Sequence, residues 1–395
     1  MRRREFLLWG ATTVACGAQL LSTEMLGRRL YWPTCEWTGP TPPAHSIIPV
    51  VGDGKWVWND PPADQTGYLE PRQYELSIGI QLGGDGPATA IQATTTVPVE
   101  LPEQKIDDVS IETSGCEAGI RRLSEHAAQL YLAAPLIRAG QVIAAIARYR
   151  LTLSKSYFGF GREQFPREQE VPKEMAREYL RTSPGIQSNV REVRDMAESL
   201  SGQIDHPWDQ AAAFHDWVRE NIDTRQGAFT SVTRALRDRV GDCEERAAVF
   251  VAFCRSVGIP ARLVWVPNHN WAEFCLLDEA GQPHWIPAHT SAYSWFGWTG
   301  AHELVLQKGD NVEVPEKRKT VRLVPDWMQW QGTRPIARYL GQLRPLPESE
   351  GGEAGPGARC KVPTGEWRVV RLDPLDTQLR DGSRALTADE IASLR

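Results

Sequence analysis

The sequence predicts an α+β fold in which an all-β region is followed by a region of helices and strands. Two patterns carry this prediction. Between Tyr74 and Leu82, apolar residues alternate with small or polar ones, which is the period of a strand with one buried face. Between Val190 and Leu200, apolar residues recur instead at the three- and four-residue spacing of a helix.

Several further strand-like runs follow the first one and are separated by clusters of Gly and Pro. They lie at residues 90–99, 109–113, 129–132 and 142–153. Short strands with turn signals between them are typical of a β-sandwich, so we expect such a domain over residues 71–155. Residues 28–70 are rich in Pro, Gly and Trp without a clear period, and are predicted to form an extended lead-in.

The helical region contains two further candidate helices. One begins near Trp208, with Asp205 as a candidate cap and Pro207 in its first turn. The other, at residues 244–257, is apolar nearly all round and is followed by Gly258. A helix of that composition belongs in a hydrophobic core. Strand-like runs come next, at residues 261–267, 271–277 and 285–286.

The composition argues against some classes of partner. Apolar residues make up 41% of the chain and charged residues 24%, as in ordinary globular proteins. The net charge is -6 and there is no basic block, so we expect no nucleic-acid partner. Beyond the N-terminus, no segment is apolar enough to be predicted to cross a membrane.

Both ends of the chain differ from the rest. Residues 1–27 are predicted to be an export signal, because Arg3 and Arg4 begin a pattern that resembles a twin-arginine signal. We therefore expect an exported protein, periplasmic or associated with the cell envelope, without a membrane span in the mature chain; a lipid anchor on Cys16 is an alternative to simple cleavage. Residues 345–395 begin with a run rich in Pro, Gly and Glu, and are predicted to be a linker and a tail.

Cys243 is the candidate nucleophile. It stands where a loop ends and the buried helix begins, so unsatisfied N–H groups and the helix dipole surround its sulfur. Both favour the thiolate, and the N–H groups could also receive an oxyanion. Glu244 and Glu245 disfavour the thiolate, so a base must lie beside it. The alternative is a buried and inert cysteine, as we expect for Cys254.

A base and a third polar group follow on a predicted hairpin. Alternation along the strand places His269, Trp271 and Glu273 on one face. The turn is centred near Glu279, so the residue opposite His269 falls within about one position of His289. A base and a polar partner at adjacent strand ends, facing a cysteine at a helix start, is the geometry of a Cys–His–X triad.

A metal site is a competing hypothesis for the same hairpin. It would use His269, Cys275, His284 and His289, which are residue types that bind zinc. Their spacing matches no structural zinc pattern, and Cys275 and His284 would lie midway along the hairpin. We therefore expect no metal and no other cofactor.

Tryptophan is concentrated in this part of the chain. Seven of the 15 Trp residues lie between Trp265 and Trp330. Those that follow the hairpin, Trp295 and Trp298, either line a groove for peptide or glycan or fill the core. The sequence leaves both alternatives open.

Four motifs occur in a fixed order through this region. They are Gly-Asp-Cys-Glu-Glu-Arg at 241–246, Gly-Ile-Pro-Ala-Arg at 258–262, His-x-Trp-x-Glu-Phe at 269–274 and Trp-Ile-Pro at 285–287. Together they resemble the bacterial transglutaminase-like superfamily over residues 185–325. The resemblance implies a papain-like core, with Cys243 as nucleophile and His269 as its base. It also implies a third residue, normally Asp, shortly after the last motif.

The chain departs from the family pattern at that third position, where His289 stands in place of Asp. A neutral His can orient His269 but cannot balance an imidazolium with negative charge. By analogy with substitutions of a triad acid, the base should be weakened by about 10-fold to 10⁴-fold. Glu273, on the same strand face, is a carboxylate that could compensate.

The predicted architecture is thus an all-β immunoglobulin-like sandwich followed by a papain-like transglutaminase core. The leading hypothesis is an exported cysteine enzyme that acts on the amide bonds of a peptide or protein substrate through a thioester on Cys243. Transfer to water makes it a peptidase or amidase, and transfer to an amine makes it a crosslinking acyltransferase. The rival hypothesis, supported by His289, is a weakly active or inactive module that binds peptide or cell-wall polymer.

Overall fold

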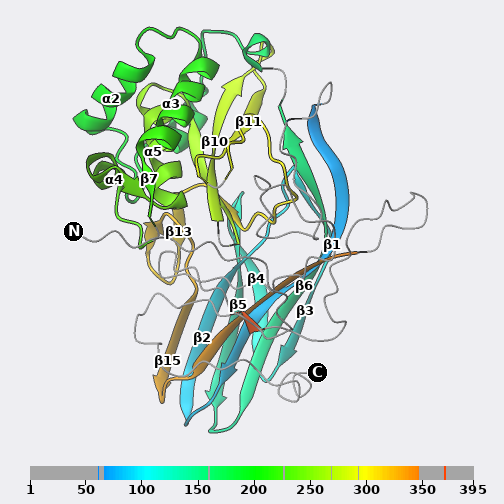
Figure 1. Cartoon of the computed structure of the whole chain (residues 1–395). Helices are drawn as coiled ribbons and strands as arrows, with labels where there is room; N and C mark the ends of the chain where they lie inside the picture. The colour runs from blue at the N-terminus through cyan, green and yellow to red at the C-terminus, as the bar shows by residue number, and fades with distance from the viewer. Residues whose placement is uncertain are drawn as a thin grey trace, which may run out of the picture.

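The computed structural model describes residues 61, 66–158, 161–225, 227–267, 269–291, 293–346 and 369–370. The predicted export signal lies outside these residues, as do Cys16, most of the lead-in and most of the tail. The helices gather at one end of the molecule and long strands occupy the other (Figure 1). No helix among the described residues is long and apolar enough to cross a membrane.

The first sheet has five strands in the order β17-β16-β1-β6-β3. Its strands are β1 (Gly67–Gly83), β3 (Gln104–Ser114), β6 (Val142–Tyr157), β16 (Ile336–Pro345) and β17 (Val369–Val370). Every neighbouring pair is antiparallel. The strand-like runs predicted at 74–82, 109–113 and 142–153 fall within β1, β3 and β6.

Among the described residues, the second sheet has eight strands: seven follow one another in the order β11-β10-β9-β12-β5-β2-β15, and β4 also pairs with β5. Its strands at the sandwich end are β2 (Ala88–Val97), β4 (Glu117–Ser124), β5 (Ala127–Ile137) and β15 (Trp327–Gly332). The sequence pattern identified neither β4 nor the returning strands β15 and β16. Most residues of β4 and β15 are exposed or half-buried, so they lack a clear apolar alternation.

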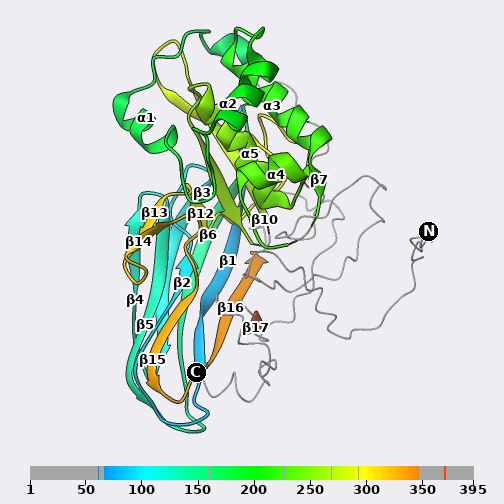
Figure 2. The same cartoon turned by 90° about the vertical axis from the view of Figure 1, so that its left-hand side faces the viewer.

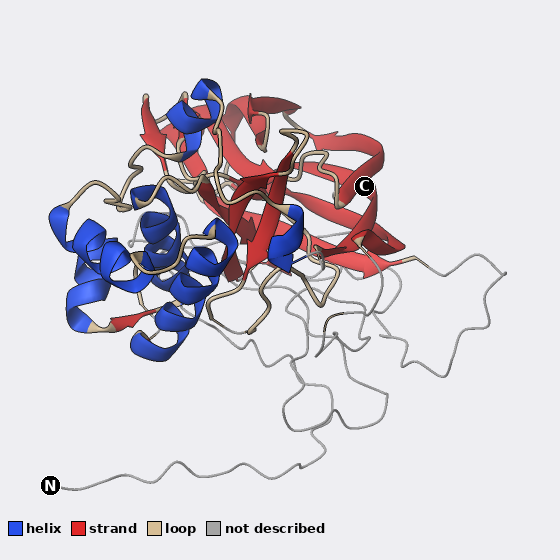
Figure 3. Cartoon of the chain, turned by 90° about the horizontal axis from the view of Figure 1, so that it is seen from above, coloured by secondary structure: helices blue, strands red, loops and turns tan. Residues whose placement is uncertain are grey.

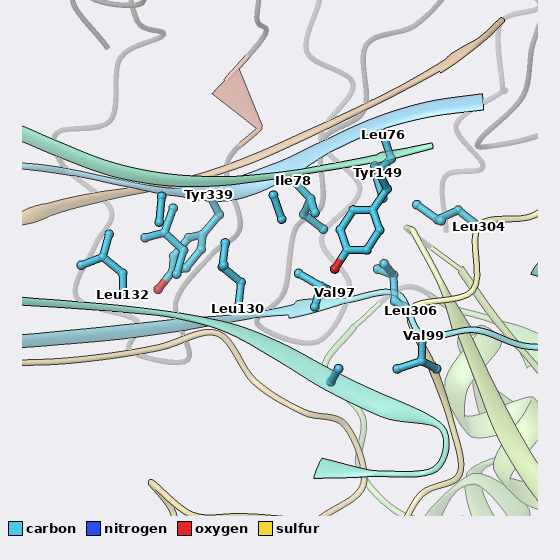
Figure 4. Packing of buried hydrophobic residues seen from close by; sticks show 14 of the residues in the cluster. Leu76, Ile78, Val97, Val99, Leu130, Leu132, Tyr149, Leu304, Leu306 and Tyr339 are labelled. Carbon is cyan, nitrogen blue, oxygen red and sulfur yellow. The ribbon is translucent and has the colours of Figure 1, made fainter. Parts of the chain in front are cut away.

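The two sheets face each other across a hydrophobic core. On β1, the alternating residues Tyr74 to Leu82 all point inward and are at most 1% exposed. Figure 4 shows Leu76 and Tyr149 of the first sheet opposite Val97 and Leu130 of the second. Each such side chain contributes about 1.5–3 kcal/mol by leaving water. Figure 2 shows the two layers from the side. An immunoglobulin-like topology for these two sheets stays a prediction.

At the helical end, the described residues form five α-helices. They are α1 (Lys173–Tyr179), α2 (Arg191–Ser201), α3 (Pro207–Asn221), α4 (Val232–Asp238) and α5 (Cys243–Ser256). Pro207 occupies the first turn of α3, as predicted, but the cap is His206. The Nδ1 of His206 accepts from the Trp208 backbone N–H at 3.2 Å, whereas the Asp205 carboxylate pairs with Arg167.

Helix α5 is the centre of this end. All of its residues from Cys243 to Arg255 are buried, which confirms the prediction of a core helix. It packs against α2, α3 and α4 on one side and against β9 and β10 on the other. Seen from above, most of the helices lie to one side of the strands (Figure 3).

The strands beside α5 continue the second sheet. They are β9 (Ala261–Val266), β10 (His269–Leu277), β11 (Pro283–Ala288) and β12 (Gln307–Lys308). Gln307 pairs with Trp265 of β9 and with Ala127 of β5. The helical end and the sandwich end therefore share one continuous sheet, joined at β12.

The remaining elements are short. They are the 3-10 helix η1 (Gly161–Gln164) and the strands β7 (Asp223–Thr224), β8 (Val240–Gly241), β13 (Val312–Val314) and β14 (Lys319–Val321). The parallel pair of β7 and β8 leads directly into the start of α5.

A buried ion cluster lies at the joint between the two ends. The Nζ of Lys308 is 2.5 Å from Glu103 Oε1 and 2.6 Å from Glu273 Oε1. Arg262 of β9 donates to Glu273 Oε2 at 2.7 Å. None of these four residues is more than 7% exposed. This group, which we call the Lys308 cluster, is neutral overall and ties β9, β10 and β12 to the turn before β3.

We expect Lys308→Met to lower the free energy of unfolding by about 3–5 kcal/mol, because it leaves buried carboxylates without this cation. Urea unfolding followed by circular dichroism measures the change. The matched control is Lys319→Met on the exposed strand β14, which should change stability by no more than about 0.5 kcal/mol. Equal stability of the two variants would show that the cluster contributes nothing.

Candidate active site

Cys243 is the first residue of α5, and a capping box fixes that position. Asp242 accepts from the backbone N–H groups of Glu244 at 2.8 Å and Glu245 at 3.3 Å. The Glu245 carboxylate accepts in return from the Asp242 N–H at 3.1 Å. A Cβ at Gly241 would lie 2.5 Å from the Cβ of Glu245, so only glycine allows this close approach.

The capping box changes one expectation about the site. The first-turn N–H groups were expected to be open to an oxyanion. Those of Glu244 and Glu245 instead donate to Asp242, so these two groups do not serve that purpose. The sequence carries a local signal for this capping box, because Asp242 is followed three residues later by Glu245.

The thiol of Cys243 has a pKa well above its ordinary value. Burial is the largest cause, and the charge of Asp242 comes next. A hydrogen bond from the backbone of Asn270 lowers the pKa, while Glu244 and Glu245 raise it, as the sequence indicated. The thiol therefore stays protonated at rest, and it reacts only if a base takes its proton.

His269, the predicted base, is the chain neighbour of the residue whose backbone contacts this thiol. It begins β10 and is followed by Asn270, whose backbone reaches the Cys243 sulfur. Burial lowers the pKa of His269 to about 4, so the imidazole is neutral at neutral pH and can accept a proton. Its Nε2 is buried and has no hydrogen-bond partner. The Asn270 backbone thus joins the start of β10, where His269 stands, to Cys243 at the start of α5.

His289 follows β11 directly and lies on the same face of the hairpin. Ala272 pairs with Ala288, so His289 stands across from Trp271, about two residues from the predicted register with His269. Its ring stacks on Trp271 at a centroid distance of 4.7 Å and lies 5.9 Å from the ring of His269. It is fully buried, and burial lowers its pKa well below the ordinary value. His289 is therefore a neutral neighbour of the base.

The backbone of His289 is held by helix α3. The Nε2 of His215 lies 2.9 Å from the His289 carbonyl oxygen. Arg219, one turn later, donates to the carbonyl oxygens of Ser291 at 3.1 Å and of Tyr293. These contacts fix the chain after β11, so the His289 ring has a defined place between the hairpin and the loop that follows.

Comparison with known proteins places this arrangement in a family. Residues 194–296 match the family model of the transglutaminase-like superfamily. This chain contains a transglutaminase-like domain. No curated protein matches the sequence.

One solved structure resembles the chain beyond that domain. A candidate cysteine protease from Cytophaga hutchinsonii aligns with a TM-score of 0.50 and 14% identity, over 77% of this chain and 98% of its own. The periplasmic domain of TgpA from Pseudomonas aeruginosa aligns with a TM-score of 0.28 and 13% identity, over 58% of this chain and 94% of its own. The first likeness concerns the fold, and it extends over most of the chain.

Glu303 is a carboxyl residue beside His289 that sequence reasoning missed. Its Oε2 lies 3.8 Å from the Nε2 of His289, and its side chain is 12% exposed. Burial raises the pKa of Glu303 to about 8, and an interaction with Trp271 opposes this rise. Glu303 lies in an irregular loop, where no periodicity marks it. A weak signal existed, since Glu303 and Asp310 are the two carboxyl residues between His289 and Val312.

Glu273, the carboxylate that the sequence suggests as a substitute for the missing Asp, is not available to His269. Glu273 belongs to the Lys308 cluster, where Lys308 and Arg262 hold its two oxygens and keep its pKa low. Asp310 is likewise occupied, because Arg255 donates to both of its oxygens at 2.9 and 2.8 Å. Neither carboxylate serves His269.

The hairpin of the transglutaminase-like domain does not gather the residues of the zinc hypothesis. Cys275 pairs with Trp285 across the hairpin, so His284, the next residue along the strand, points to the opposite face. The Nε2 of His284 lies 2.9 Å from Asp278. Among the described residues, no three His, Cys, Asp or Glu side chains come close enough to hold a metal ion.

The tryptophans after the hairpin are core residues. Tyr293, Trp295 and Trp298 are at most 7% exposed and form a small buried cluster with Tyr157 packed against it. The rings of Tyr293 and Trp295 stack at 3.8 Å. These side chains support the loop after His289. Their burial favours a core role over the alternative of a groove for peptide or glycan.

We expect the transglutaminase-like domain to lose stability as the pH falls from 6.5 to about 4, partly because of His269. The folded chain holds this imidazole neutral, whereas the unfolded chain protonates it near pH 6.5, so unfolding is favoured as the pH falls. The contribution is on the order of 3 kcal/mol.

Denaturant unfolding at several pH values measures this loss. His269→Gln should make the pH dependence shallower without removing it, because burial also lowers the pKa of His302 to about 4. The wild-type chain measured at the same pH values is the control. An unchanged slope in His269→Gln would mean that this imidazole is not held neutral.

Proposed function

We propose that this protein is an exported cysteine enzyme that acts on amide bonds through a thioester on Cys243. The observation that carries the proposal is the juxtaposition of two groups. A cysteine at the first residue of a capped, buried helix lies against the start of a strand that presents a neutral imidazole, His269. The transglutaminase-like domain and the shared fold of a candidate cysteine protease support the same class of chemistry.

The proposed reaction uses the neutral pair in two steps. His269 takes the thiol proton as the Cys243 sulfur attacks the amide carbon, and it then gives this proton to the leaving amine. The products of this first step are a free amine and a thioester on Cys243. Water then attacks the thioester with His269 as base, which releases a carboxylic acid and restores the thiol. An amine in place of water would form a new amide.

Hydrolysis is the outcome that we favour, so the enzyme would be a peptidase or amidase. The proposed substrate is a peptide or protein, and a polymer of the cell envelope is an alternative. The proposed location, periplasmic or associated with the cell envelope, depends on the twin-arginine-like start at Arg3 and Arg4. The rival proposal is a weakly active or inactive module that binds peptide or cell-wall polymer at the same site. It is supported by the absence of Asp at position 289.

We expect the full chain, incubated with a peptide mixture, to release products that mass spectrometry detects. A labelled amine in a parallel incubation distinguishes the two acceptors, because it enters the products only if acyl transfer occurs. Cys243→Ala should lower the rate by roughly 10³-fold or more, and His269→Ala should have a similar effect.

Cys254→Ala is the matched control for this experiment. It removes a second buried thiol from the same helix and should leave the rate nearly unchanged. If neither substrate turnover nor a thioester on Cys243 is found, while labelled peptides still bind, the rival proposal of a binding module is correct.

A further inference from the structure

We infer that Glu303, in its ionised form, supplies through His289 the negative charge that the site lacks at position 289, and that it thereby acts as a positioning residue for His269. The inference rests on the proposed function, since it concerns the base of that reaction. It assigns a role to a carboxyl group outside the four sequence motifs.

His289 lies close to both the Glu303 carboxyl group and the His269 ring. The ring of His289 lies 5.9 Å from that of His269, and its Nε2 lies 3.8 Å from Glu303 Oε2. His269 and His289 also lie with their ring planes within 26° of each other. The three side chains come from the start of β10, from the residue after β11 and from the loop before β12.

These side chains carry buried polar atoms that the fold leaves without hydrogen-bond partners. They are Nε2 of His269, both ring nitrogens of His289 and Oε2 of Glu303. Each buried polar atom of this kind is unfavourable for folding, and their concentration at one place is typical of a functional site. The gap between His289 and Glu303 is longer than a hydrogen bond, and such contacts often tighten only when substrate binds.

The charges around His289 explain why a carboxylate is needed. His269 from β10, and His215 and Arg219 from α3, all disfavour a positive charge on His289. When His269 takes the proton of Cys243, a second positive charge appears in this buried space. The ionised fraction of Glu303, which grows as the pH rises towards its pKa of about 8, would polarise His289, so that His289 accepts a hydrogen bond from the imidazolium. The proton stays on His269 until it passes to the leaving amine.

Other carboxyl groups near the base do not take this role. Glu273 is held by Lys308 and Arg262, and Asp310 by Arg255. Glu303 is paired with no Lys or Arg among the described residues, and burial raises its pKa to about 8. A buried acid of this kind lowers the stability of the folded chain as the pH rises through that value, because the folded state resists its ionisation.

We expect Glu303→Gln to lower kcat by about 10-fold or more with little change in KM, as for loss of a triad acid. The same variant should melt at an equal or higher temperature than the wild type at about pH 9, because it removes a buried charge. A merely structural role for Glu303 predicts the opposite change in melting temperature.

A double substitution tests the path through His289. His289→Asp places a carboxylate directly beside His269, so Glu303→Gln should cost much less activity in this background than in the wild type. Equal losses in the two backgrounds, or wild-type activity of Glu303→Gln, would overturn the inference and leave the proposed function intact, provided that Cys243→Ala is inactive. Absence of any turnover that depends on Cys243 would overturn both.

Discussion

The position of the candidate site depends on the neutral Lys308 cluster. Lys308 joins Glu103 of the sandwich end to Glu273 of β10, and Arg262 completes the pairing from β9. Buried ions are tolerated only when each is paired, so these strands have one favourable arrangement. Because His269 begins β10, the cluster also sets where the base meets α5. It explains why Glu273 has a structural role, although it shares a strand face with His269.

Burial has a second consequence, which concerns protonation. It raises the pKa of the Cys243 thiol and lowers that of His269, so both groups are neutral at rest. The charge separation that chemistry requires must then arise during the reaction, when substrate is present. In this buried, apolar site, the energy of forming the Cys243 thiolate and the His269 imidazolium depends strongly on any nearby charge. The position of Glu303 behind His289 is significant for that reason.

The fold could be predicted in part. Apolar alternation indicated β1 and β6, and the apolar composition of residues 244–257 indicated a buried helix. The returning strands were missed, because β16 pairs with β1 from a distant part of the chain and local patterns do not report such pairing. Likewise, nothing local indicated that β12 would join the helical end to the sandwich in one sheet.

The sequence by itself determined the residue types of the candidate site and their local setting. A helix start at Cys243 and a shared strand face for His269 and Trp271 follow from interactions between near neighbours in the chain. The tertiary structure alone decided which carboxylates are paired with a Lys or Arg side chain, and which carboxyl group lies next to His289. Those outcomes depend on residues such as Lys308 and Glu303, whose contacts are made only when distant segments pack together and exclude water.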